Sequence, residues 1–216
     1  NVGLQHATGD YVVFVDSDDY WANTDDLERL VKEVIKTPDC DFIGFNCSYY
    51  YEESGKVIPW VKYNDDILKT VHTIKCIDNL VVSGTFPMSA CMKIIKRDCL
   101  RGKIEFIKGI YSEDIPWFIE LLKRSNKCRF VNQYIYMYRK GVATSISSSF
   151  SYKKYSDLFR LLRDGVEINK KDCEGQVRDA LYSFWAYQLC ILRAMTGFMD
   201  QEQRKEELRE LYKYNW

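Results

Sequence analysis

The order of hydrophobic and polar positions near the start of the chain predicts a strand, an acidic loop and a helix. Aromatic and β-branched residues run without a break over 11–15, which is typical of a strand buried on both faces of a parallel sheet. The acidic run over 16–19 then reads as a loop. Apolar residues recur at helical spacing over 27–35, and Pro38 ends this helix.

The pattern continues with short alternating elements. We expect strands over 41–51 and 57–61 joined as a hairpin, a helix over 73–80, a strand over 90–95, a helix with Ser112 as its N-cap, and strands over 128–131 and 135–138. The serine-rich run 144–149 is typical of a linker, and the residues beyond 151 read as helices. We therefore place a boundary near residue 148, with a first unit over 1–148 and a helical C-terminal region over 149–216.

Composition narrows the class of protein. The chain has 216 residues, is 46% hydrophobic and carries 31 basic against 31 acidic side chains. This hydrophobic content excludes disorder of the whole chain, and zero net charge predicts no nucleic-acid partner. The eight cysteines show no C-x-x-C spacing, so we expect reduced thiols and a cytoplasmic protein. Cys91 and Cys190 lie in apolar runs and are expected in the core.

The acidic loop is the first candidate for chemistry. Asp16, Asp18 and Asp19 follow directly after the first predicted strand. Crowded carboxylates repel one another, and a cation commonly neutralises them. Oxygen ligands suit Mg²⁺ or Mn²⁺, which often bridge one or two carboxylates to a phosphate of the substrate. The alternative is a solvated turn in which an aspartate caps the next helix.

Two later groups of polar residues are weaker candidates. The pair Glu113-Asp114 stands at a helix start. A carboxylate there acts as a general base if burial adjusts its pKa, but it also simply complements the helix dipole. Arg139, followed by Ser145 and Ser147, could hold a phosphate, although an ordinary strand end with a surface arginine explains the same pattern.

The order of these motifs resembles the family 2 glycosyltransferases. Residues 1–21 are similar to that family's pattern of N-x-G-x-x-x-A-x-G-x-Y followed by a hydrophobic strand and D-S-D-D. Further landmarks follow in the same order and at comparable spacing: Lys93, Phe106, Gly109, Glu113-Asp114, Tyr138-Arg139 and Ser145-Ile146-Ser147. The resemblance covers residues 1 to about 148.

This resemblance implies an α/β fold, a partial Rossmann-like nucleotide-sugar domain of the A-type, followed by a helical region. The implied activity is an inverting, metal-dependent transfer of a sugar from a UDP- or GDP-type donor to an acceptor hydroxyl. The implied acceptor is a saccharide or lipid-linked saccharide in surface polysaccharide or glycolipid assembly. By position, Asp16, Asn1 and Gly3 would belong to the donor-binding set, and Asp18 with Asp19 would hold Mn²⁺ or Mg²⁺ and, through it, the diphosphate.

The acid pair takes the remaining roles that the resemblance implies. Asp114 would remove the acceptor proton, and Glu113 would support it. Two departures stand out: Lys108-Gly109 replaces the family's usual turn, and the family's first strands, which hold the nucleobase, would precede residue 1. We therefore expect these residues alone to be impaired in donor binding, with exposed sheet edges that favour a homo-oligomer.

Two alternative functions are left open. A strand that ends in Asp-x-Asp also resembles haloacid-dehalogenase-type phosphatases, although Tyr20 and Trp21 stand where that family has Thr or Val. A non-catalytic module that binds a divalent cation is the second. The C-terminal aromatics, from Tyr182 to Tyr187, are expected to pack on the first unit, while a contact with a lipid-linked acceptor at the membrane periphery is left open.

Overall fold

The computed structural model describes residues 1–100, 102, 104–141 and 149–214. The strands are β1 Tyr11–Val13, β2 Tyr20–Trp21, β3 Phe42–Tyr51, β4 Lys56–Pro59, β5 Lys93–Lys96 and β6 Cys128–Lys140. The helices are α1 Val2–His6, α2 Asp26–Lys36, α3 Asp65–Lys69, α4 Thr73–Val82, α5 Arg97–Leu100, α6 Asp114–Arg124, α7 Tyr152–Asp172, α8 Gly175–Met195 and α9 Gln201–Lys213, with short 3₁₀ turns η1 Ala90–Met92 and η3 Thr196–Phe198.

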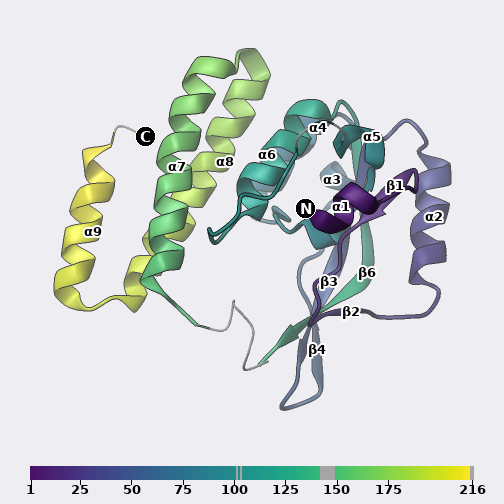
Figure 1. Ribbon diagram of the computed structural model, residues 1–216, viewed down its shortest axis with the longest axis horizontal. Coiled ribbons are helices and arrows are strands. Elements are labelled where there is room, and N and C mark those ends of the chain that lie inside the picture. Colours follow the sequence, from purple (N-terminus) through teal and green to yellow (C-terminus); the bar gives the residue numbers. More distant parts are fainter. Residues whose placement is uncertain (101, 103, 142–148, 215–216) are drawn as a thin grey trace.

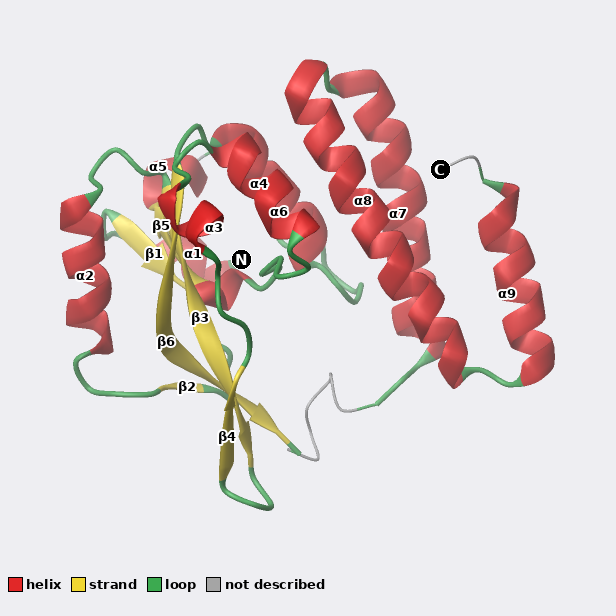
Figure 2. Ribbon diagram, turned by 180° about the vertical axis from the view of Figure 1, so that it is seen from behind, coloured by secondary structure: helices red, strands yellow, loops and turns green. Residues whose placement is uncertain are grey.

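The described strands form one mixed sheet with the order β1-β5-β3-β6-β2, and β4 pairs with β3. β3 and β6 are parallel, and the other pairs are antiparallel. Helix α2 covers one face of the sheet, and α4 and α6 lie on the other (Figure 1). Beyond them lie α7 and α8, with α9 outermost (Figure 2). The chain is therefore an α/β fold followed by helices, as expected.

The alternation of side chains along β3 explains these layers. Phe42 packs on the side of α4 and α6, and Ile43 and Phe45 point to the side of α2. Between them, Gly44 pairs with Phe130 of β6, and a Cβ at residue 44 would lie 2.3 Å from Cε1 of that ring. A side chain at residue 44 would therefore have to displace the ring of Phe130, where β3 and β6 lie side by side.

The hairpin and two of the predicted helices are confirmed. β3 and β4 are antiparallel around a turn in which Gly55 has a φ of 65°, and α2 and α4 occupy the ranges that the spacing predicted. The apolar face predicted for α2 is only partly right. Leu30 is buried, but Leu27 and Ile35 are 51% and 70% exposed, because the buried side of this helix carries Asp26, Leu30 and Glu33.

Three strand predictions need correction. The run 11–15 forms a strand only to Val13, and its partner β5 is antiparallel to it. The strand expected over 90–95 begins as the 3₁₀ turn η1. The two strands expected over 128–138 are one continuous strand, β6. Its register with β3 shifts beside Asn46, and this irregularity accommodates the polar residues from which the sequence pattern predicted a break between two strands.

The C-terminal helices share a core with the sheet domain. The rings of Phe86 and Phe184 lie 4.8 Å apart, and Trp185 packs so closely on α7 that a Cβ at Gly165 would be 2.0 Å from it. The packing on the first unit that the sequence predicted is therefore confirmed for Phe184, whereas Trp185 packs on α7. Residues 142–148 lie outside the described residues, and the boundary near 148 stays a prediction.

Two further findings concern the surface. Cys91 is buried, but Cys190 is exposed on α8, so the expectation of a buried thiol is wrong for Cys190. It lies on a side of α8 that the core does not cover. No helix in the described part of the chain is long and apolar enough to cross a membrane.

The close approach at Gly44 gives the first prediction. Gly44→Ala should lower the free energy of unfolding by about 1–3 kcal/mol, because the new methyl group forces Phe130 out of place. Urea unfolding followed by circular dichroism measures this change. Gly197→Ala is the matched control, since a Cβ there meets nothing within 4 Å. Equal effects of the two substitutions would contradict the packing described for β3 and β6.

Candidate active site

The acidic loop after β1 is held by the middle of β6. The backbone N–H of Asp16 donates to the hydroxyl of Tyr136 over 3.1 Å, and Asp19 N–H donates to the Asp16 carbonyl over 3.1 Å. Tyr136 is almost fully buried, and burial raises its pKa, so its hydroxyl remains protonated. The acidic loop therefore begins at a hydrogen bond to a buried, neutral side chain.

Arg139 holds the second half of the loop. Its N–H donates to Asp19 Oδ1 over 2.8 Å, and its Nη1 donates to the Asp18 carbonyl over 3.1 Å. The guanidinium also pairs with Glu52 at the tip of β3 and β4. Arg139 therefore braces the acidic loop in the described structure.

The acid pair lies at the start of α6, but Ser112 does not cap this helix. Ser112 adopts a φ of 62°, and Glu113 occupies the N-cap position without a side-chain hydrogen bond. The Ser112 carbonyl instead accepts from Ile115 N–H over 3.0 Å. The prediction of a Ser112 cap is therefore wrong: the left-handed backbone at residue 112 turns the chain so that Glu113 and Asp114 begin the helix.

The structure brings the acidic loop and the acid pair together. Burial raises the pKa of Asp114, Lys93 opposes this rise, and repulsion from Glu113 and Asp16 adds to it. Asp16 is exposed by more than a third, yet partial burial of its carboxylate and repulsion from Asp18 and Glu113 also raise its pKa. These interactions join carboxylates from distant segments into one charged site.

The turn η1 acts on both halves of the site. The Cys91 thiol opposes the rise in the pKa of Asp16, and the Ala90 backbone opposes the rise in the pKa of Asp114. Two consecutive residues therefore each favour the ionised form of one of the two acids.

Aromatic packing makes a second link between the halves. The ring of Phe14 meets those of Phe106 and Trp117 edge-on, each at 5.5 Å, and these two stack at 4.9 Å. Asn1 completes this cluster, since its side chain exchanges two hydrogen bonds of 2.8 Å with the backbone of Phe106. Asn1 is thus engaged with this loop, and Gly3 lies exposed on α1.

The acidic loop offers oxygen ligands for a divalent cation. No group of three or more His, Cys, Asp or Glu side chains in the described residues is placed to hold a metal ion by itself. Asp19 Oδ2 is buried without a hydrogen-bond partner in the same part of the chain, and burial raises the pKa of Asp19. This set fits a cation that takes one or two carboxylates from the protein and further oxygens from a phosphate and water.

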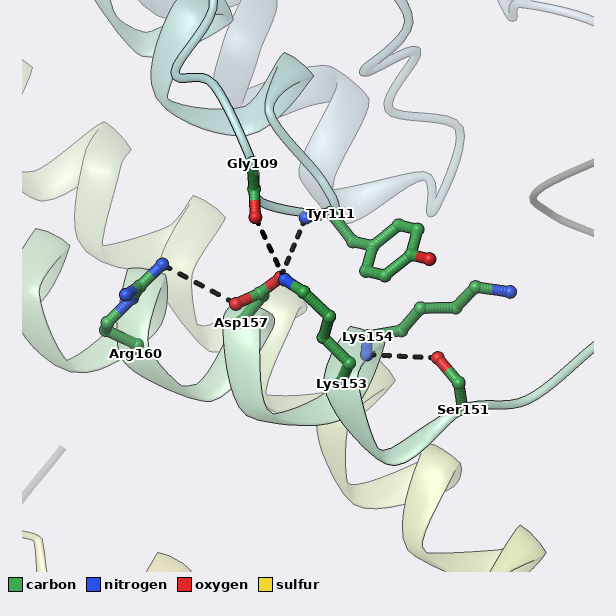
Figure 3. Close-up of polar contacts among 7 residues, drawn as sticks. All are labelled: Gly109, Tyr111, Ser151, Lys153, Lys154, Asp157 and Arg160. Atoms are coloured by element: carbon green, nitrogen blue, oxygen red, sulfur yellow. Dashed lines mark hydrogen bonds and ion pairs between the residues drawn. The ribbon is translucent and has the colours of Figure 1, made fainter.

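Helix α7 fixes the loop that leads to the acid pair (Figure 3). Asp157 is 6% exposed and accepts hydrogen bonds from Tyr111 N–H over 2.9 Å and from Lys153 Nζ over 2.6 Å. Lys153 also donates to the Gly109 carbonyl over 3.0 Å. Burial would raise the pKa of Asp157, but Lys153, the Tyr111 N–H and Arg160 together lower it. Asp157 is therefore ionised and ties residues 109 and 111 to α7.

The supporting residues of the site were missed by sequence reasoning. Arg139 was considered only as a phosphate ligand or surface residue, Lys93 only as a landmark of the resemblance, and Tyr136 and Asp157 were given no role. Ala90 contributes only its backbone, which no side-chain pattern can indicate. The spacing of Asp157 to Lys153 and Arg160 does predict local ion pairs on a helix, but it says nothing about the loop that Asp157 contacts.

Comparison with known proteins identifies the class. Residues 1–143 match the family described as glycosyl transferase family 2. Because this match covers more than half of the chain, the chain belongs to that family. This membership favours the glycosyltransferase over the two alternatives, the phosphatase and the cation-binding module.

Two curated relatives are glycosyltransferases. The chain is 28% identical over 142 residues to YibD of Escherichia coli K12, which covers 64% of this chain and 40% of YibD. It is 25% identical over 180 residues to GlyG of Streptococcus pneumoniae serotype 4, which covers 80% of this chain and 56% of GlyG. The chain thus spans about half the length of these relatives.

Solved structures show the same fold. A crystal structure of residues 1–349 of TarS from S. aureus in complex with UDP-GlcNAc superposes with a TM-score of 0.68 at 19% identity, covering 94% of this chain and 56% of that chain. A second crystal structure of TarS superposes with a TM-score of 0.62, and the match covers 33% of the TarS chain. The likeness extends beyond residue 143, so it includes C-terminal helices.

The contact between α7 and the loop before the acid pair gives the second prediction. Asp157→Ala should speed amide hydrogen exchange in peptides that span 107–112, because the Tyr111 N–H loses its acceptor and the buried contact is worth about 1–3 kcal/mol. Mass spectrometry measures the exchange. Glu167→Ala on the same helix is the control, since it removes only an exposed ion pair with Lys170. Unchanged exchange over 107–112 would show that Asp157 does not hold the loop.

Proposed function

We propose that the protein transfers a sugar, with inversion, from a nucleotide-diphosphate sugar to an acceptor hydroxyl. The observation that carries this proposal is the meeting of the acidic loop with Glu113-Asp114 through the turn η1, in a member of glycosyl transferase family 2. One half of this site suits a diphosphate held through a cation, and the other supplies a partly buried carboxylate. A phosphate-bearing donor and a hydroxyl acceptor need these two functions side by side.

Asp16 and the acidic loop form the donor half. The proposed donor is of the UDP or GDP type, with UDP favoured because TarS, which shares the fold, was crystallised with UDP-GlcNAc. Asp16 would face the nucleoside sugar. Asp18 would be the main ligand of Mn²⁺ or Mg²⁺, since no hydrogen bond to its carboxylate forms within the described residues, whereas Asp19 is held by Arg139. When bound, the cation would offset charge on the leaving diphosphate.

Asp114 is the proposed general base. The acceptor oxygen forms a bond to the anomeric carbon as the bond from that carbon to the diphosphate oxygen breaks, and the acceptor proton moves to Asp114. Burial raises the pKa of Asp114, which makes its carboxylate a stronger base than an exposed aspartate. Glu113 would support the base from the N-cap position. The acceptor class, a saccharide or lipid-linked saccharide of surface polysaccharide or glycolipid assembly, belongs to the same proposal.

Donor binding provides the third prediction. UDP-GlcNAc should bind with Mn²⁺ and lose affinity about tenfold or more when the metal is removed by chelation or when Asp18 is changed to Asn, because a charge-assisted contact is lost. Isothermal titration calorimetry with UDP, GDP and their sugars measures this. Asp25→Asn, an equal charge change at an exposed position, is the control. Donor binding that changes neither on chelation nor in Asp18→Asn would overturn the assignment of the metal to the acidic loop.

The base assignment gives a fourth prediction. Asp114→Asn should lower the rate of transfer by about 10²–10⁴-fold, the range of a lost general base, while the donor dissociation constant stays within about threefold. Release of nucleoside diphosphate in the presence of an acceptor measures the rate. Glu120→Gln on the same helix serves as control. Retention of the full rate in Asp114→Asn would assign the base elsewhere.

Transfer should also depend on pH through this residue. Because the base must be ionised and its pKa is raised, kcat/KM should begin to fall at a higher pH than an exposed aspartate would cause, by about tenfold for each pH unit below that pKa. A profile of kcat/KM, with donor affinity measured at each pH, separates this effect from binding. A flat profile down to pH 4 would exclude Asp114 as the base.

A further inference from the structure

Lys93, the first residue of β5, is a fully buried cation that the proposed reaction does not use. Its Nζ donates to the carbonyls of Pro87, Ser89 and Met88 over 2.7, 2.6 and 3.4 Å. A neutral amine has only two N–H groups, so three converging acceptors match the ammonium form. Burial lowers the pKa of Lys93, and Asp114 and Cys91 oppose this change.

The surroundings of Lys93 explain how a buried charge is tolerated. The ring of Phe118 lies 4.1 Å from Nζ, so its negative face adds to the three carbonyl dipoles. No carboxylate of the described residues forms an ion pair with Lys93. Asp114 therefore acts on it through space, and the favourable energy between them depends on both charges being present.

The carbonyls that accept from Lys93 belong to the segment that leads into η1. In this turn the Ala90 backbone favours ionisation of Asp114, and the Cys91 thiol favours ionisation of Asp16. Ser89 reinforces the turn, because its Oγ accepts from Cys91 N–H over 3.2 Å. A single ammonium group thus fixes the backbone of the turn that stabilises both carboxylates.

We propose that Lys93 is a positioning residue for the base: its ammonium group holds the carbonyls of residues 87–89 against the ring of Phe118, one turn after Asp114 on α6, and so fixes η1 beside the acid pair. This role rests on the proposed function of Asp114. The other titratable groups that face Asp114 are Glu113 on its own helix, Asp16 after β1 and Cys91 in η1. The two acids oppose ionisation of Asp114, so Lys93 is the cation that favours it within the described part of the site.

The test measures the carboxyl carbon of Asp114 by NMR in the 216-residue chain, so it does not require transfer activity. Lys93→Met keeps a long apolar side chain but removes the charge and the three donors. Asp114 should then titrate about one pH unit or more higher, and the Ala90 amide proton should no longer follow that titration. Lys93→Arg, which keeps the charge, should restore most of the original titration.

Lys96→Met, at the other end of β5, is the matched control, because in the described part of the chain Lys96 Nζ donates only to the Pro38 carbonyl at the surface. If Lys93→Met does not fold, the reciprocal experiment decides. In Asp114→Asn, the Cε resonance of Lys93 should titrate lower than in the parent chain, because the carboxylate that favours its charge is gone.

The outcomes separate this inference from the proposed function. An unchanged Asp114 titration in folded Lys93→Met overturns the inference, and so does an unchanged Lys93 titration in Asp114→Asn. Where transfer is measured, the acid limb of kcat/KM in Lys93→Met should move to higher pH by the same amount, with donor affinity retained. A parent chain that binds no donor but shows the coupled titrations would instead overturn only the proposed function.

Discussion

Repulsion between carboxylates is the constraint on which this structure depends. Two loops far apart in the sequence bring Asp16 and its neighbours against Glu113 and Asp114, and each carboxylate raises the free energy of ionising the next. Such a site persists only if donors and cations are supplied around it. The surrounding fold does this with a tyrosine hydroxyl, backbone N–H groups, a thiol and one buried ammonium.

These compensating groups come from the elements that define the sheet. β6 lies beside β3 in parallel and carries Tyr136 and Arg139 to the acidic loop. β5 begins with Lys93, next to Gly44 of β3, and the turn before it carries Ala90 and Cys91. The close approach of β3 and β6 at Gly44 therefore matters to the site. It sets the position of β6, which carries Tyr136 and Arg139, relative to β5 and the turn before it.

Sequence reasoning predicted the features that have a local pattern in the sequence. It missed the features that depend on contacts between residues far apart in the sequence. The order of strand, acidic loop and helix follows from periodicity, and the family resemblance follows from the spacing of short motifs in residues 1–143. Periodicity cannot say what covers an apolar face, as exposed Ile35 shows. Nor does it reveal that Ser112 adopts a positive φ, or that Lys93 contacts carbonyls rather than a carboxylate, since both depend on contacts made after folding.

The helices that follow the residues of the family match also support the site. The match ends at residue 143, yet Asp157 of α7 holds the backbone at Tyr111, three residues before Asp114. Phe184 of α8 packs against Phe86, one residue before the segment that Lys93 gathers. The loop before the acid pair and the segment before η1 therefore both pack against the C-terminal helices. The geometry of the base consequently depends on the sheet domain and these helices together.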